Sequence, residues 1–156
     1  MKMRMCFSPI LALSVLLFFT STLDAAGRGK LLARGMIKRS AVVVFIAYKK
    51  VKENKNYTGD LARAIAHQKL AKKFYRRGEY FRAMHQTKRA RWLAVQAIKA
   101  NKGQEPKEGE MTRAEKTGTG KGPSDEKLDA ELRQELPDEP ARDQDILSST
   151  PDMDIK

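Results

Sequence analysis

The stretch that decides the fold is TGDLARAIAHQKLAKKFYRRGEYFRAMHQTKRARWLAVQAIKANKG, residues 58–103. It contains no proline, and residues that favour helices make up more than half of it. Gly78 interrupts it, which predicts one helix near 60–77 and a second near 79–101. Apolar or small residues of the second helix recur with the spacing of a single helix face: Tyr80, Ala83, Met84, Thr87, Ala90, Ala94, Ala97 and Ile98. That face needs another surface to pack against.

Large and small side chains alternate across the expected turn, at Leu70, Ala71, Phe74, Gly78, Tyr80, Ala83 and Ala90. This pattern resembles one tetratricopeptide repeat, near 64–97, in which two antiparallel helices pack through alanines around a glycine turn. The resemblance implies a helical hairpin with these seven residues at its interface. His67, Thr87 and Val95 depart from the family pattern, and no second copy of the repeat follows. We therefore take only the hairpin geometry from it.

A second apolar centre lies in residues 36–54, MIKRSAVVVFIAYKKVKEN. One set of its apolar residues has helical spacing: Ile37, Ala41, Val44, Tyr48 and Val51. The β-branched residues around Val43 also suit a strand over 41–48, but no other segment offers a pairing partner. We favour a helix near 32–54. The predicted fold class is all-α, with about three helices.

The N-terminal residues 1–26 have the outline of a signal peptide, with early basic residues, an apolar run and small residues at the end. Cleavage there would make the protein exported, either periplasmic or secreted. An uncleaved membrane anchor is the alternative, because residues 5–23 carry no charge. The only cysteine, Cys6, lies in this segment, so the mature chain would rely on helix packing without disulfides.

Charge divides the chain into two blocks. Residues 1–102 hold 23 Lys and Arg against 4 Asp and Glu, a net charge of +19, and residues 103–156 carry −7. We interpret residues 27–102 as a basic helical domain and residues 103–156 as an acidic tail. Such a division indicates an anionic partner for the basic block, while two solvated surfaces of opposite sign would give the same composition.

The candidate binding residues lie on the second hairpin helix, where two aromatic side chains are set among cationic ones: Phe81, Arg82, His85, Lys88, Arg89, Trp92 and Lys99. Phe81 and Trp92 are 11 positions apart and project to nearly the same side. They would serve as stacking platforms for bases or as anchors at an anionic membrane. We favour the alternative that they pack against the 36–54 helix, because a small domain has few other large core residues.

Catalytic and metal chemistry find little support in the sequence. His67 and His85 are the only histidines, and neither has a carboxylate three or four positions after it. The run Gly118–Gly122, GTGKG, lacks the first glycine and the final hydroxyl residue of a phosphate-binding loop. We expect no catalytic residues, no metal site and no cofactor.

The acidic tail begins with a glycine-rich stretch over 103–125, expected to be a mobile linker. Residues 124–136, SDEKLDAELRQEL, place Leu128, Leu132 and Leu136 at helical spacing after a capping serine. A short amphipathic helix there would need a partner surface, and the basic block of the same chain is the nearest one. The rest of the tail is expected to be disordered.

These observations predict an exported, non-enzymatic helical interaction or structural protein. Its partner would be an anionic envelope surface, acidic polymer or acidic protein, bound through a Lys/Arg-rich face. The alternative is a nucleic-acid-binding module that uses Phe81 and Trp92 among the surrounding lysines and arginines.

Overall fold

The computed structural model describes residues 10–140 and 142–148, with side chains from residue 27 onward. Over this part of the chain all regular structure is helical, which confirms the predicted class. The elements are α1 (Ile10–Asn54), α2 (Asp60–Arg76), α3 (Tyr80–Ala100), the 3-10 turn η1 (Lys107–Gly109), α4 (Arg113–Thr119), α5 (Asp125–Glu135) and α6 (Asp143–Leu147). The expected number of about three helices is therefore too low, because the tail adds three short ones.

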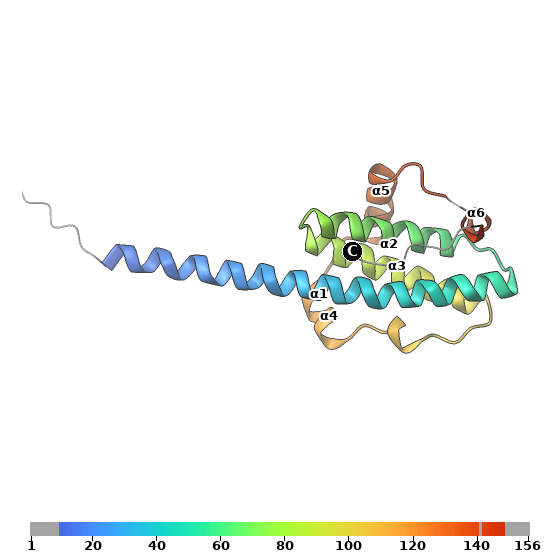
Figure 1. Ribbon diagram of the computed structural model, residues 1–156, viewed down its shortest axis with the longest axis horizontal. Helices are drawn as coiled ribbons and strands as arrows, with labels where there is room; N and C mark the ends of the chain where they lie inside the picture. Colours follow the sequence, from blue (N-terminus) through green and yellow to red (C-terminus); the bar gives the residue numbers. More distant parts are fainter. Residues whose placement is uncertain (1–9, 141, 149–156) are drawn as a thin grey trace, which may run out of the picture.

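The second half of α1 lies alongside α2 and α3 in a three-helix bundle, while its first half projects beyond the bundle (Figure 1). Residues 41–48 are helical, so the helix is confirmed and the strand is not formed. Ile37, Val44 and Val51 are fully buried against the other two helices. Burial of this seam outweighs the modest helix propensity of the β-branched residues.

The hairpin between α2 and α3 turns at Gly78, whose φ of +80° is one that glycine adopts without strain. The backbone N–H of Glu79 donates to Phe74 O at 2.9 Å and closes the turn. At the end of α3, the residue with a left-handed backbone conformation is Lys102 rather than Gly103. Gly103 is needed for space instead, because a Cβ there would lie 2.5 Å from the Ile98 side chain.

Small side chains bring the three helices close together. Of the expected packing residues, five are fully buried: Leu70, Ala71, Phe74, Ala83 and Ala90. Tyr80 is half-buried beside Tyr75, and Gly78 is exposed in the turn. Five of the seven expected packing residues are thus buried in the bundle. Hairpins of this kind occur in many all-α folds, so the hairpin alone does not assign the chain to the tetratricopeptide family.

Within residues 103–140 and 142–148 the acidic tail forms short packed helices in place of the expected mobile linker and largely disordered end, while residues 149–156 lie outside the described residues. Its first part, η1 and α4, lies against α1 and α3, whereas α5 lies across α2 and α3 and α6 contacts α1 and α2 (Figure 1). Leu128 is buried, and Leu132 and Leu136 pack on the α2–α3 cluster, so the helix expected at 124–136 is present on the basic block. The composition of the linker did not indicate the specific ion pairs that hold it against the bundle.

Asp143, in the last part of the tail, caps the start of α2. Its carboxylate accepts hydrogen bonds of 2.9 Å from the backbone N–H groups of Gly59 and Ala62. These are donors that the first turn of a helix leaves unpaired, and the negative charge suits the helix N-terminus. Thr58, just before the start of α2, contributes less to this cap. Its hydroxyl accepts only from Asp60 N, at 3.3 Å, while the tail supplies the other two bonds.

The expected signal peptide lies outside the described side chains. Residues 1–9 are not described, and residues 10–26 are described only as helical backbone. Cleavage and the alternative of an anchor therefore stay predictions. Within residues 27–140 and 142–148, no helix combines the length and apolar character that a membrane crossing requires.

Candidate functional site

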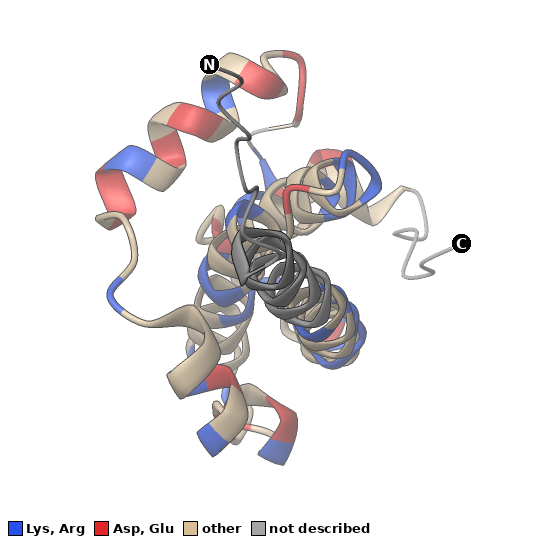
Figure 2. Cartoon of the chain, turned by 90° about the vertical axis from the view of Figure 1, so that its left-hand side faces the viewer, with Lys and Arg blue, Asp and Glu red and all other residues tan. Residues whose placement is uncertain are grey.

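The seven candidate residues form the outer ridge of α3. They are Phe81, Arg82, His85, Lys88, Arg89, Trp92 and Lys99. The opposite side of this helix is lined with alanines and packs on α1 and α2. Five members of the ridge are exposed, whereas His85 and Arg89 are buried. They are buried because α5 and the loop before it lie against the ridge, and Figure 2 shows Asp and Glu residues spaced along α5.

Arg89 is the centre of this contact. Its Nη1 donates to Asp125 Oδ2 at 2.7 Å, and its Nε and Nη2 donate to the two oxygens of Asp129 at 3.1 and 3.0 Å. A guanidinium held by both oxygens of one carboxylate is the strongest form of such a pair. The same guanidinium lies 4.9 Å from the centre of the Trp92 ring. Arg89 is therefore occupied by an acidic helix of its own chain.

His67 is fully buried beneath this ion pair, on α2. Its Nδ1 lies 2.5 Å from Gln86 Oε1, and its Nε2 lies 3.0 Å from Asp129 Oδ1. Burial lowers the pKa of His67, and the contacts with Gln86 and Asp129 oppose that shift only in part. The sequence offered no carboxylate partner because Asp129 is 62 positions away.

Asp129 joins the two helices of the hairpin through one carboxylate. Besides Arg89 and His67, it accepts a 2.6 Å hydrogen bond from Arg63 Nη2. Its burial raises the pKa, but the hydrogen bond and charge of Arg89 and the charge of Arg63 outweigh that effect, so the pKa is lowered overall. Asp129 is therefore the anion around which this site is built.

Arg82 repeats the arrangement near the hairpin turn. Its Nε and Nη2 donate to Glu131 Oε1 at 3.0 and 2.7 Å, and Glu79 accepts a further bond from Nη1. The guanidinium also lies 3.9 Å from the centre of the Phe74 ring. Gln86 Nε2 donates to Glu131 from the side. Two arginines of the ridge are thus bridged to two turns of α5.

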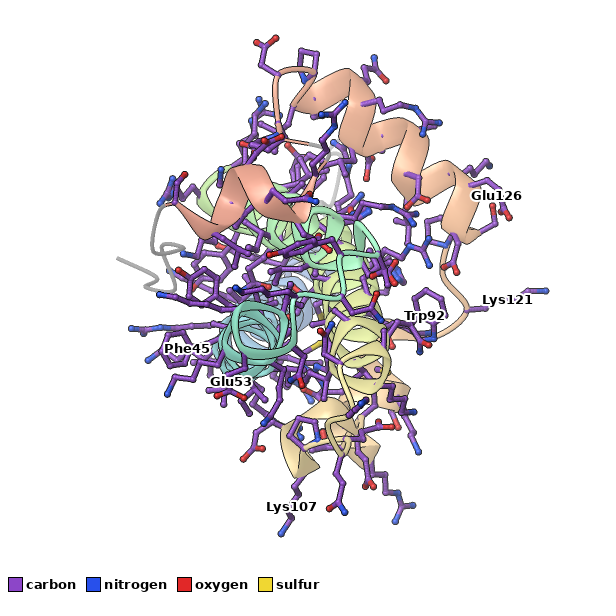
Figure 3. All side chains as sticks on the ribbon, turned by 90° about the vertical axis from the view of Figure 1, so that its right-hand side faces the viewer. Phe45, Glu53, Trp92, Lys107, Lys121 and Glu126 are labelled. Carbon is purple, nitrogen blue, oxygen red and sulfur yellow. The ribbon has the colours of Figure 1, made fainter. Side chains whose placement is uncertain are left out.

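Phe81 and Trp92 do not pack into the core. They are 59% and 50% exposed, so the favoured prediction that they pack against the 36–54 helix is wrong. The reason is rotational, because the alanines take up the inner side of α3 and leave the aromatic residues pointing outward. Trp92, Lys88 and Lys121 border a hollow of about 410 Å³ between α3 and the loop before α5. Figure 3 shows Trp92 and Lys121 on the same side of the molecule.

Lys99 lies at the far end of the ridge and pairs with Glu105 at 2.8 Å. Both side chains are partly exposed, so this pair adds little stability. At the other end Phe81 meets His85 edge to face, with ring centres 5.4 Å apart. Burial and the charge of Lys88 lower the pKa of His85. The ring is therefore neutral at physiological pH and contributes no positive charge there.

A second buried carboxylate lies on the other side of α3. Glu115 of α4 accepts hydrogen bonds from Arg91 Nη1 and Nη2 at 3.1 and 2.9 Å and from Arg39 Nη1 at 2.9 Å. It also accepts from the backbone N–H of Thr112, which completes a capping box on α4. Although burial raises the pKa of Glu115, the bonds from Arg91 and Thr112 lower it overall. This carboxylate fastens α4 to α1 and α3.

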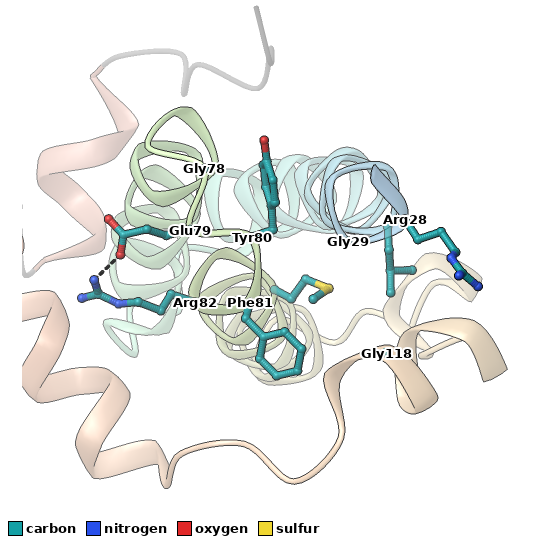
Figure 4. Close-up of a pocket in the computed structure, with 10 residues that line it drawn as sticks. Arg28, Gly29, Gly78, Glu79, Tyr80, Phe81, Arg82 and Gly118 are labelled. Atoms are coloured by element: carbon teal, nitrogen blue, oxygen red, sulfur yellow. Dashed lines mark hydrogen bonds and ion pairs between the residues drawn. The ribbon is translucent and has the colours of Figure 1, made fainter. Parts of the chain in front are cut away.

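An open cleft of about 640 Å³ lies where α1 leaves the bundle (Figure 4). Its lining is largely apolar and includes Leu32, Tyr80, Phe81 and Met84 together with Arg28. The dashed line in Figure 4 joins Glu79 and Arg82, which neutralise each other at its edge. The lining supplies no nucleophile with an adjacent base.

In the residues that the structure describes, no cluster of three or more His, Cys, Asp or Glu side chains is arranged to hold a metal ion. No protein-family model, no curated protein and no solved structure matches this chain. The arrangement of charges on the bundle is therefore the basis for assigning a function.

The sequence identified the cationic members of the ridge and missed their acidic partners. These partners, Asp129 and Glu131, stand in a tail whose composition predicts solvation, as does Glu115 on the other side of α3. One signal was available: Asp125 and Asp129 are four positions apart, on the helix side next to Leu128. Carboxylates that flank an apolar seam are placed to meet cations wherever that seam packs.

Proposed function

We propose that this protein is an exported, non-enzymatic interaction protein that contacts an anionic partner through the outer ridge of α3. The observation that supports this most directly is the way α5 lies on the ridge, with Arg82 and Arg89 each bound to its carboxylates. A surface that holds an acidic helix from its own chain has the chemistry to hold one from another chain. The tail then acts as an internal competitor.

The form of α5 indicates what such a partner would look like. Its acids at 125 and 129 contact the ridge while Leu128 is buried between them. We expect a partner segment to carry acidic residues three or four positions apart beside a leucine-like residue. A flexible polyanion would reach Lys88 and Lys99 but would not fill the apolar contact.

A test uses the complete protein and a fluorescent peptide of sequence SDEKLDAELRQELP, which copies residues 124–137. Neutralising Asp125→Asn and Glu131→Gln removes two contacts of α5 with the ridge. We expect this double variant to bind the added peptide more tightly than the parent, by about tenfold at low salt, with a smaller gain as salt rises.

The matched control is the double variant Glu126→Gln and Asp138→Asn, which changes the net charge equally within the same segment. Both of these side chains are exposed, and Figure 3 shows Glu126 pointing away from the bundle. Its peptide affinity should stay close to that of the parent. Equal affinities for all three proteins would contradict the proposal.

A nucleic-acid-binding module is a second candidate, favoured by the exposure of Phe81 and Trp92. Trp92 stands beside Lys88 and Lys121, and stacking beside cations is how single strands are bound without sequence preference. Titration with a thymidine oligonucleotide should quench Trp92 fluorescence if this function holds. Absence of quenching at low salt would reject it and leave the protein partner.

A further inference from the structure

The outer face of α1 is a second cationic surface, distinct from the ridge of α3. We use this name for seven residues that follow one another at intervals of three and four along the helix: Leu31, Arg34, Lys38, Val42, Phe45, Lys49 and Lys52. All seven are exposed. The three apolar members are 71%, 46% and 36% exposed, so they contribute little to the core.

Charge on this face is of one sign. Its four charged members are cations, and within residues 27–54 the only acidic residue is Glu53, which pairs with Lys50 at 2.9 Å. The acidic helix α5 lies on the other side of the bundle. Figure 3 shows Phe45 on the side opposite Trp92 and Glu126. Among the residues that the structure describes, no ion pair joins a carboxylate of the tail to a cation of this face, whereas carboxylates of α5 pair with the ridge.

We propose that the outer face of α1 lies on the surface of a bilayer that contains anionic lipids. Apolar side chains aligned with lysines and arginines are what an interfacial helix presents, with the apolar groups at the acyl boundary and the cations at the headgroups. From residue 31 to 52 the contact would run along about 33 Å of helix. Lys49 already lies 4.6 Å from the centre of the Phe45 ring, with its charge beside the apolar group.

Continuity along α1 gives a second reason. The same helix continues without a break toward residue 10, and residues 10–19, ILALSVLLFF, are the most apolar run in the sequence. If this segment is kept as an anchor, it brings the adjoining outer face to the lipid surface with it; if it is cleaved, the outer face binds the surface by its own side chains. A second copy of the chain is a poorer occupant, because two cationic faces repel each other. This proposal does not rest on the function assigned to α3.

The test places a reporter on each side of the bundle in the complete protein. Phe45→Trp puts an indole on the outer face of α1, with Trp92 replaced by Phe so that it reports alone; the native protein reports from Trp92. Vesicles of phosphatidylglycerol and phosphatidylcholine carry bromine on the acyl chains. We expect the indole at 45 to shift to shorter wavelength and to be quenched strongly, and Trp92 to be quenched little.

Charge is tested by Lys38→Gln with Lys49→Gln, against the control Lys107→Gln with Lys121→Gln. Lys107 and Lys121 are exposed outside α1 and lie away from Phe45 in Figure 3. The α1 pair should lower vesicle partitioning about tenfold or more, and the control pair should lower it much less. Circular dichroism checks that each variant is folded.

Several outcomes would overturn the proposal. They are bound protein with no quenching at 45, equal quenching at 45 and 92, equal losses for the two lysine pairs, or no binding to anionic vesicles. A wavelength shift at 45 that follows protein concentration without vesicles would assign the face to a second copy and also reject it. Peptide binding to α3 is measured separately, so either proposal can fail alone.

Discussion

The outer ridge of α3 and the outer face of α1 are both cationic helix surfaces with exposed aromatic residues, yet the acidic tail packs against the first and not against the second. On the ridge, Arg82 and Arg89 are bound by carboxylates of α5. On α1, the cations at 34, 38, 49 and 52 are exposed, and Phe45 of the same face lies on the side opposite Glu126 of the acidic helix (Figure 3). The difference shows that the tail does not neutralise the bundle as a diffuse counter-charge. It pairs with particular cations, both buried arginines such as Arg91 and exposed lysines such as Lys69, while no ion pair among the described residues reaches the four cations on the outer face of α1.

The largest expected effect concerns Glu115, the buried carboxylate that fixes the tail to α3. Glu115→Ala leaves Arg91, 2% exposed, without its anion, and should lower the free energy of unfolding by about 3–5 kcal/mol. Denaturant unfolding measures this. On α1, Glu53→Ala breaks the exposed pair with Lys50 and should cost under about 0.5 kcal/mol. Similar losses for both variants would contradict the distinction between a buried ion pair made by the tail and an exposed ion pair on α1.

The next effect is pH-dependent and belongs to His67 of α2, which contacts Asp129 beneath the ridge. The pKa of His67 is lowered from 6.5 by burial, so the native state binds a proton there less readily than the unfolded chain. Stability is thus fully present above pH 6.5 and falls as the pH drops below it, by at most about 1.4 kcal/mol per pH unit. His67→Gln should flatten the stability curve just below pH 6.5. An unchanged slope in that variant would refute the assignment.

The carboxylates should affect stability in a lower pH range than the histidine does. The pKa values of Glu115 and Asp129 are lowered, so the stability they provide is present above their unfolded values of 4.5 and 3.8 and is lost as the pH falls below them. The curve of the His67→Gln protein should keep this lower step.

Asp143 gives a smaller effect, at the end of the tail. Asp143→Ala removes the cap on the first turn of α2 and should cost about 1 kcal/mol. Asp145→Ala, an equal charge change two positions away on α6, is the control and should cost under about 0.5 kcal/mol. Hydrogen exchange should quicken at Ala62 in the first variant only. Matching behaviour of the two variants would mean that α6 does not cap α2.

The smallest effect is expected on the outer face of α1. Leu31 is 71% exposed, so Leu31→Ser should change the free energy of unfolding by less than about 0.5 kcal/mol in the absence of lipid. A thermal or denaturant melt checks this. A loss of more than about 1.5 kcal/mol would show that this face is covered in solution.

The sequence by itself determined the all-α class, the helices near 60–77 and 79–101, the turn at Gly78 and the alanine-rich packing of the hairpin. It also predicted the end of α1 but placed its start near 32, whereas the helix begins at Ile10. These features follow from local rules, because helix periodicity and a glycine turn each depend on residues that are only a few positions apart. The helix at 124–136 and its docking on the basic block could be predicted for the same reason, from the spacing of Leu128, Leu132 and Leu136.

Tertiary structure alone decided which charges meet. Asp129 reaches Arg89 from 40 positions away, and Asp143 reaches Gly59 from 84 positions away. A carboxylate in a polar tail looks the same in sequence whether it is solvated or paired, and so composition predicted a mobile linker where α4 is held by Glu115. The direction of Trp92 was likewise set by how α3 is rotated in the bundle. Local pattern fixes a helix and its apolar side, but only packing against the rest of the chain decides what its outer side touches.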